Sequence, residues 1–386
     1  MRDLPGAILP VAFDVTDPIA SPTMHTLPDT REIRRALVPY AVASTPHGLA
    51  LFAGDFVLYL AALAGVLFSP WGWLQGLASV FAGIKVVNLV TLGHEASHQS
   101  LTASRRLNHW LAIAAFTPGL FNYRLWLYDH HNLHHHNTNE LHPDSYTPLT
   151  LAQYRALGRW GRFKQRVYRS RSLLVFGLYY IVERWWQAKF FPRARMPAHV
   201  RRQAWPHFRY LLAYLVTFLA MLAAAPLYSP TSSLTAVLLG FCVPFYVFQS
   251  LFAFSVYVQH THPRVPWFAA KPDRQREGRQ ELISVHLHFP YWFSLLAHHA
   301  YDHAAHHVHP AIPSYRIKAA QARLNALLGP AAISDRFSLA WLFDVQRRCK
   351  LYDFERNQWL DFEGRPTAEP AGVDPSGLAH PHAVTA

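Results

Sequence analysis

"HHNLHHHNTN", residues 130–139, places five histidines within seven positions. In a chain that is 51% hydrophobic, so much imidazole in one place is typical of a metal site, a pH-sensitive segment or a solvated loop. Further histidine groups elsewhere in the chain favour the metal site. They are His94 and His98 in "GHEASH", His260 and His262 in "VQHTHP", and His303, His306 and His307 in "YDHAAHHVHP".

The composition predicts a membrane protein. Charged residues make up only 15% of the chain, against roughly 25% in ordinary soluble domains. The formal charge of +13 does not indicate nucleic-acid binding, because the basic residues flank apolar blocks, where they can meet anionic lipid headgroups. Four apolar blocks approach the ~20 residues that a membrane-spanning helix needs. They cover about residues 49–68, 73–92, 210–227 and 234–258.

The turns between these blocks predict two helical hairpins and their orientation. "SPWG" separates the first two blocks and "YSPTSS" the last two, and neither turn carries Lys or Arg. Between His94 and Phe208 there are sixteen Lys and Arg but only five Asp and Glu. The positive-inside rule therefore places both termini and the long central segment in the cytoplasm, as in a multi-pass protein of a bacterial inner membrane. Cys242 lies in a predicted span and Cys349 in the cytoplasmic part, so we expect no disulfide between them.

We accordingly predict an all-α integral membrane protein with four transmembrane helices under a helical cytoplasmic cap. Residues 1–47 are interpreted as a cytoplasmic lead-in, residues 48–365 as one membrane unit, and residues 366–386 as a disordered tail. The cap comprises residues 94–208 and 260–365. Apolar stretches near residues 110–123 and 173–191 carry charges or prolines, which favours helices that lie in the membrane interface.

The histidine spacings are those of metal ligands on α-helices, where positions i, i+3 and i+4 share a face. Together with the histidine at the end of the fourth span, they give nine imidazoles on the cytoplasmic side. Nine ligands suffice for two metal ions with open positions, and imidazole suits zinc, copper, iron or nickel. The predicted ligands are His94, His98, His131, His134, His135, His260, His303, His306 and His307.

These motifs resemble the three histidine boxes of membrane fatty acid desaturases and the related hydroxylases. "HEASH", "HNLHHHNT" and "HAAHH" stand in the order of that family, and "QHTHP", "HHVHPAIPSY" and "CKLYDFERNQWLDFEG" are similar to the omega-6 type. The second box also fits with His130 in place of His131; His131 is chosen because the family string then continues through Asn137 and Thr138.

The resemblance implies a di-iron centre, O2 as cosubstrate, two electrons per turnover and an acyl-chain tunnel that opens from the membrane. It implies O2-dependent insertion of a C=C bond into an acyl lipid or acyl thioester, with hydroxylation of a lipid chain as the alternative. No "HPGG" segment is present, so we expect electrons from a separate ferredoxin or cytochrome b5-type donor with its reductase. Outside the ligands, the expected supporting residues are Asp129, Asp302, Glu95 and Asn137.

Two other classes fit part of the sequence. "HEASH" satisfies the His-Glu-x-x-His motif of zinc proteases, with Glu95 as the general base, but that motif leaves the other two boxes unexplained. A metal transporter would need polar ligands near the middle of the membrane, whereas these histidines lie at or beyond the ends of the spans.

Overall fold

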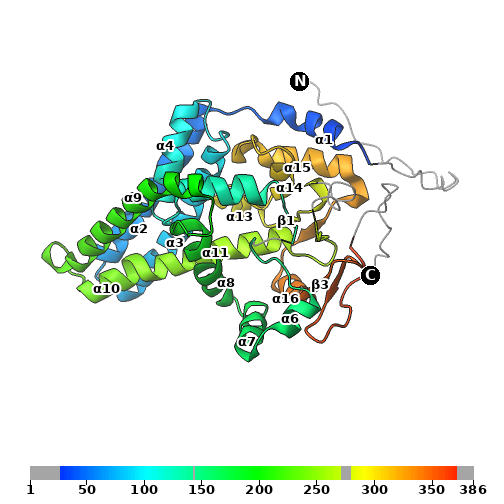
Figure 1. The fold of residues 1–386 in the computed structure, drawn as a ribbon. Coiled ribbons are helices and arrows are strands. Elements are labelled where there is room, and N and C mark those ends of the chain that lie inside the picture. The colour runs from blue at the N-terminus through cyan, green and yellow to red at the C-terminus, as the bar shows by residue number, and fades with distance from the viewer. Residues whose placement is uncertain (1–26, 142–143, 271–279, 372–386) are drawn as a thin grey trace, which may run out of the picture.

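The computed structural model describes residues 27–141, 144–270 and 280–371, and this part of the chain is mostly helical (Figure 1). The α-helices are α1 (Thr30–Leu37), α2 (Thr45–Phe68), α3 (Gly72–Ser97), α4 (Arg105–Phe116), α5 (Tyr123–Trp126), α6 (Leu151–Ala156), α7 (Arg159–Tyr168), α8 (Val175–Tyr179), α9 (Ala198–Ala223), α10 (Ser233–Val237), α11 (Val243–His260), α13 (Tyr291–Leu296), α14 (His303–Val308), α15 (Ser314–Leu328) and α16 (Leu339–Arg348). Wider π-helical turns cover Leu127–His134, Tyr180–Phe190 and Leu238–Cys242.

Four helices are long and apolar enough to cross a membrane, as predicted. They are α2, α3, α9 and the continuous segment Ser233–His260, which joins α10 to α11. The third begins at Ala198, twelve residues before the predicted start at Tyr210. Its first turns carry Arg201 and Arg202, so this part of the helix is polar and escapes a hydropathy criterion. The helix ends before Pro226, which cannot continue its hydrogen bonding.

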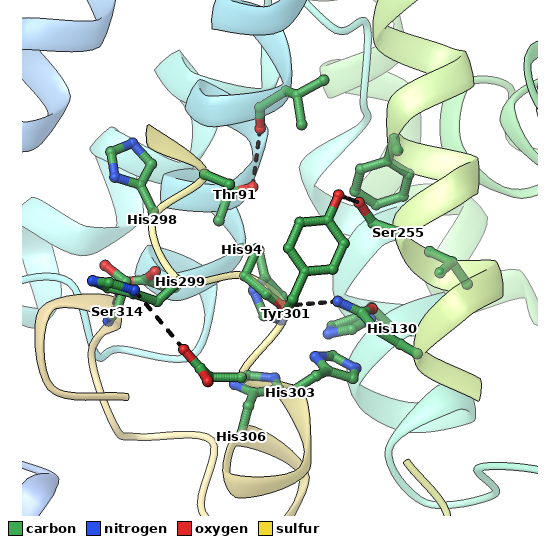
Figure 2. A pocket seen from close by; sticks show the side chains of 18 of the residues that line it. Thr91, His94, His130, Ser255, His298, His299, Tyr301, His303, His306 and Ser314 are labelled. Atoms are coloured by element: carbon green, nitrogen blue, oxygen red, sulfur yellow. Dashed lines mark hydrogen bonds and ion pairs between the residues drawn. The ribbon is translucent and has the colours of Figure 1, made fainter. Parts of the chain in front are cut away.

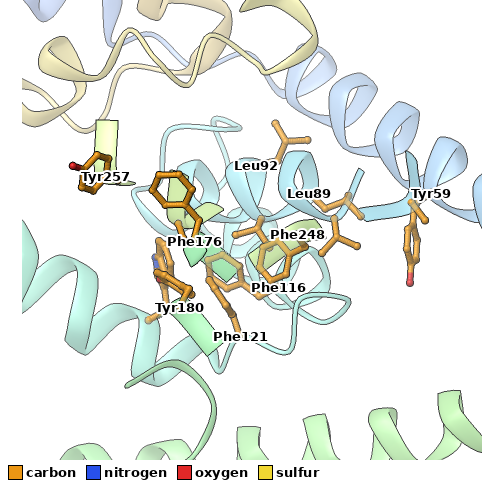
Figure 3. Close-up of a cluster of buried hydrophobic side chains, with 14 of the residues drawn as sticks. Tyr59, Leu89, Leu92, Phe116, Phe121, Phe176, Tyr180, Phe248 and Tyr257 are labelled. Atoms are coloured by element: carbon orange, nitrogen blue, oxygen red, sulfur yellow. The ribbon is translucent and has the colours of Figure 1, made fainter. Parts of the chain in front are cut away.

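Helices α3 and α11 cross closely at the centre of the bundle. A Cβ atom on Gly83 of α3 would lie 2.8 Å from the carbonyl oxygen of Pro244 on α11, so only glycine permits this approach of the two backbones. The main core packs around the crossing (Figure 3) and is rich in aromatic rings, among them Phe116, Phe121 and Phe248. This crossing brings the last turns of α3 and α11 to the same region, where both helices carry histidines.

The remaining elements form the part of the molecule that surrounds these helix ends. A second core joins α1, α14 and α15. Strand β1 (His286–His288) pairs in parallel with β2 (Ser334–Arg336), and β3 (Leu351–Asp353) pairs antiparallel with β4 (Gln358–Leu360).

Both end segments contain folded residues. Helix α1 lies within the segment interpreted as a lead-in. Beyond residue 365, Thr367 donates from its backbone to Trp359 and Ala371 to Asn357, so the chain is held through Ala371. The rest of the predicted tail, residues 372–386, and the first 26 residues of the predicted lead-in lie outside the described residues.

Candidate metal centre

Nine imidazoles converge at the ends of α3 and α11 and form two groups. Within each group, the potential ligand atoms lie within 4.8 Å of one another. Several of them are seen in Figure 2, including His94, His130, His303 and His306. The first group holds five residues, His94, His98, His130, His135 and His306; the second holds four, His134, His260, His303 and His307. Eight of the nine predicted ligands are thus brought together, and His130 takes the place of the ninth.

The difference between His130 and His131 follows from the local helix type. Residues Leu127–His134 form a π-helix, in which the His135 N–H donates to the His130 carbonyl, five residues back, at 3.0 Å. In this wider turn, residues five apart face the same way, and the Nε2 atoms of His130 and His135 lie 3.1 Å apart. His131 points elsewhere, with its Nε2 2.9 Å from the Ser97 hydroxyl. The α-helical spacing expected for His131, His134 and His135 therefore does not apply here, and the family string through Asn137 and Thr138, on which the choice of His131 rests, does not report the helix type.

The ring nitrogens are spaced as metal ligands would be. With a metal–nitrogen distance of about 2.1 Å, ligands at right angles lie about 3 Å apart. In the first group, the Nε2 atoms of His306 and His135 are 3.2 Å apart. In the second group, the Nε2 of His303 lies 3.1 Å from that of His260 and 2.9 Å from that of His307.

The hydrogen bonding within the described chain also fits two metal ions. The Nε2 atoms of His94 and His98 are buried and have no hydrogen-bond partner among the described residues. Leaving a buried polar atom unpaired is costly, and a metal ion in the first group would use both lone pairs. The residues present therefore fit a two-metal site.

The protonation state of the site suits metal binding. Burial, followed by the charges of neighbouring histidines, lowers the pKa of each ligand-group histidine that lies outside the spans and for which a shift is resolved, namely His98, His130, His135, His303, His306 and His307. At neutral pH these imidazoles are uncharged, the form in which a ring nitrogen can ligate a metal.

A buried network of charges orients the second group. The Nδ1 of His134 lies 2.6 Å from the Asp144 carboxylate, which fixes the ring so that its other nitrogen faces the group. Arg184 reaches both Asp144, at 3.4 Å, and Asp129, at 2.9 Å. Lys189 forms an ion pair with Asp129. The sequence does not point to Asp144, Arg184 or Lys189, because they stand outside the histidine motifs and form no spaced motif of their own.

The role expected for Asp129 differs from the observed one. Its hydrogen bonds in the described chain go to Arg184 and Lys189, and it does not contact a ligand imidazole. Burial alone would raise the pKa of Asp129, but the charges of Arg184 and Lys189 outweigh this and keep the pKa below its ordinary value. Asp129 therefore neutralises two buried cations next to the site, and Asp144 makes the contact with a ligand histidine.

In the described chain, the side-chain hydrogen bonds and ion pairs of the other three expected supporting residues go to groups other than the nine grouped imidazoles. Asp302 lies 2.8 Å from the Nε2 of His286, and the Asn137 amide donates to the Leu133 carbonyl at 3.0 Å. The Glu95 carboxylate accepts from the backbone N–H of Ser314 at 3.0 Å, at the first residue of α15. This contact ties α3 to α15 and gives Glu95 a structural partner, which weakens the zinc-protease alternative.

A cavity opens beside the histidines, between α3 and α11. Its walls contain both apolar and polar side chains. Val87 and Thr91 of α3 and Phe252 of α11 lie along it, and the segment from Ala297 to His303 closes one side. The Tyr301 and Ser255 hydroxyls lie 3.1 Å apart across this space (Figure 2). Both groups of histidines contribute to the lining, so a molecule in the cavity lies directly against the proposed metal sites.

Comparison with known proteins agrees with this geometry. The pattern that defines the fatty acid desaturase family matches residues 68–338. The chain is 24% identical over 294 residues to an sn-1 oleoyl-lipid 12-desaturase of Synechocystis, covering 75% of this chain and 79% of that protein. It is 26% identical over 293 residues to an sn-1 oleoyl-lipid 12-desaturase of Anabaena variabilis, covering 74% and 78%.

It is also similar to a chloroplastic omega-6 fatty acid desaturase of Spinacia oleracea, at 23% identity over 298 residues, covering 76% of this chain and 63% of that protein. The family pattern begins at the last residue of α2, covers the other three candidate membrane helices, ends just after β2, and includes every histidine of the two groups. The chain belongs to the fatty acid desaturase family and is an oxidoreductase.

Proposed function

We propose that this protein inserts a double bond into the acyl chain of a membrane lipid, using O2 at a di-iron centre. The observation that carries the proposal is the convergence of nine imidazoles into two adjacent groups beside a cavity between two membrane helices. The relatives are named as sn-1 oleoyl-lipid 12-desaturases or as omega-6 fatty acid desaturases, and these names favour an acyl-lipid substrate over an acyl thioester.

One iron is assigned to the five-histidine group and the other to the four-histidine group. When bound, the irons supply the activation of O2 that removal of hydrogen from an unactivated CH2 requires. Two hydrogens leave adjacent carbons of the chain, two protons and two electrons enter, and O2 is released as two waters. The electrons come from a separate ferredoxin or cytochrome b5-type donor with its reductase.

The protein's own residues supply position. The CH2 groups of an acyl chain are chemically alike, so selection of one carbon depends on where the cavity holds it. Val87 and Phe252 give the chain an apolar wall. The Asp144 carboxylate holds the His134 ring in place, and Asp129 neutralises the buried charges of Arg184 and Lys189 next to the ligands.

The membrane arrangement is part of the same proposal. The spans form two hairpins, with the turns near Trp71 and Ser229 outside and both termini in the cytoplasm of a bacterial inner membrane. Residues 48–365 form the functional unit, with the metal centre in the part of the chain formed by residues 94–208 and 260–365.

Expression in a host that lacks polyunsaturated lipids tests the proposal. Gas chromatography of the host lipids should reveal a new unsaturated chain, and the His94→Ala variant, expressed at a matched level, should produce none. A hydroxylated chain in place of an unsaturated one would overturn desaturation in favour of the hydroxylase alternative. Purified protein that contains one zinc and no iron would overturn the di-iron assignment.

A further inference from the structure

Helix α13 presents an apolar face that the rest of the described chain does not cover. Four of its six residues, Tyr291, Trp292, Leu295 and Leu296, are between 53% and 64% exposed. The opposite side is packed: the Phe293 ring contacts Phe289 and Tyr301, and Ser294 is buried. A short helix with one packed side and an outer face of Tyr, Trp and Leu is typical of an element at the edge of a lipid layer.

Two hydrogen bonds place α13 beside the membrane helices. The Asn88 amide of α3 donates to the Leu296 carbonyl, the last residue of α13, at 2.8 Å. Asn88 lies nine residues before the end of α3 at Ser97, which is about 13 Å along the helix axis. The second bond joins His298, two residues after α13, to Asp55 of α2 at 2.5 Å. The end of α13 therefore lies well inside the ends of both spans.

The neighbouring helix α2 also has an exposed apolar side. Asp55 is buried on the inner side of that helix, where Lys85 also contacts it at 2.8 Å. Val57, two residues further along, is 61% exposed on the outer side. Because His298 follows α13 by two residues, its bond to Asp55 holds the end of α13 near α2. The Lys318 ammonium lies 5.8 Å from the Tyr291 ring, a position suited to contact with lipid headgroups.

We propose that α13 is inserted in the cytoplasmic edge of the lipid layer and forms one wall of the route by which a lipid's acyl chain reaches the metal centre. The segment that directly follows α13, Ala297–Tyr301, lines the cavity, and Val87 and Asn88 line it from α3. An acyl chain that leaves the bilayer beside α13 and follows the Ala297–Tyr301 segment along α3 reaches the histidines without crossing water. The route rests on the proposed function; the insertion does not.

Spin labelling tests the insertion. In a Cys242→Ala background, which removes the exposed cysteine and retains the buried Cys349, single cysteines replace Trp292, Val57 and Arg356. Val57 serves as the lipid control with matched exposure, and Arg356, whose side chain is 75% exposed at the β3–β4 turn, serves as the water control. In phosphatidylcholine nanodiscs, collision of the label with O2 and with a water-soluble nickel chelate is measured by electron paramagnetic resonance.

We expect the ratio of O2 to nickel accessibility at position 292 to lie nearer that at position 57. A ratio nearer that at position 356 would place α13 in water and overturn the insertion; the apolar face would then be free for a protein partner. These substitutions are on exposed side chains and leave the histidines intact, so the result does not depend on enzymatic activity.

Photo-crosslinking of the unmodified chain tests the route. A phosphatidylcholine with a diazirine in its acyl chain is incorporated into the nanodiscs, irradiated, and the labelled residues are found by mass spectrometry. We expect label both on α13 and on Ala297–Tyr301. Label on α13 alone, or on neither, would overturn the route. The lipid analysis of the host tests desaturation separately, so failure of the route and failure of the proposed function are distinguishable.

Discussion

The pair His130 and His131 offers a sharp test of the metal centre, because adjacent residues of the same type have different contacts. His130 lies in the five-histidine group, with its Nε2 3.1 Å from that of His135. His131 lies outside both groups and contacts the Ser97 hydroxyl at 2.9 Å. Each is replaced by alanine, so that the two variants lose the same side chain and serve as controls for each other.

The expected effects differ in kind. Loss of a residue that merely orients a ligand costs about 10–100-fold in metal affinity, so loss of a ligand should cost at least ~100-fold, or about 2.7 kcal/mol. His130→Ala should therefore reduce bound iron from two per chain towards one. His131→Ala removes one hydrogen bond, worth about 1 kcal/mol of stability, and the stacking of the His131 ring on His98, with centroids 4.0 Å apart. Ser97 still donates to the His94 carbonyl and accepts from the Trp126 indole, so iron should be retained.

The assay is elemental analysis of both variants, purified without a chelating tag, together with their unfolding temperatures. His130→Ala should lose iron, whereas His131→Ala should keep it and unfold at a slightly lower temperature. If His131→Ala loses iron and His130→Ala retains the full content, the π-helical geometry of this segment, and the ligand set drawn from it, are wrong.

Three further predictions concern neighbouring parts of the site. His260→Ala should abolish product and lower iron content, because it removes one of only four histidines in the second group, whereas His262→Ala should retain iron, since His262 pairs with Asp335 at 3.0 Å; equal iron loss in both variants would contradict this. Asp144→Asn should weaken iron binding by about 10–100-fold, because the carboxylate lies 2.6 Å from the Nδ1 of His134; titration of the apoprotein with ferrous iron measures the change, and an unaltered affinity would show that Asp144 does not orient the ligand. The hydrogen bond from His262 lowers the pKa of Asp335 to about 2. Because this pKa is depressed on folding, the stabilisation is present above about pH 4 and is lost as the pH falls towards 2. The difference in unfolding temperature between the protein and Asp335→Asn should therefore shrink over that interval, and a constant difference would exclude the linkage.

The sequence predicts the features that depend on local pattern. Apolar length alone located four spans, and histidine spacing identified eight of the nine imidazoles that converge. Helix α9 begins twelve residues before the predicted span, because hydropathy reports contact with lipid, whereas the helix itself continues through polar residues such as Arg201. A pattern of apolar residues thus marks where a helix meets lipid and does not mark where the helix begins.

The remaining features depend on contacts between distant segments. Asp144 and Arg184 are 40 residues apart and meet only because the π-helix Tyr180–Phe190 packs beside the second histidine motif. Helix α13 was assigned to the cytoplasmic cap, but its hydrogen bond with Asn88 draws it towards the spans. His130, and not His131, lies in the first group because the helix in this segment is of the π type. The sequence of residues 130–136, which holds the five histidines, carries no signal that distinguishes an α-helical turn from a π-helical turn.

The division of the histidines between the two groups explains why paired histidines occur in the second and third motifs. Successive residues on an α-helix point about 100° apart, and those in a π-helical turn are also directed well away from each other, so the two members of a His-His pair cannot readily serve one metal. In this structure each pair is split: His135 belongs to the first group and His134 to the second, and likewise His306 and His307. Each of these two segments therefore contributes to both groups, and the separation between the groups is set by adjacent residues of one backbone. A two-metal site built in this way would keep its spacing even where α3 and α11, which contribute His94 and His260, shift relative to each other.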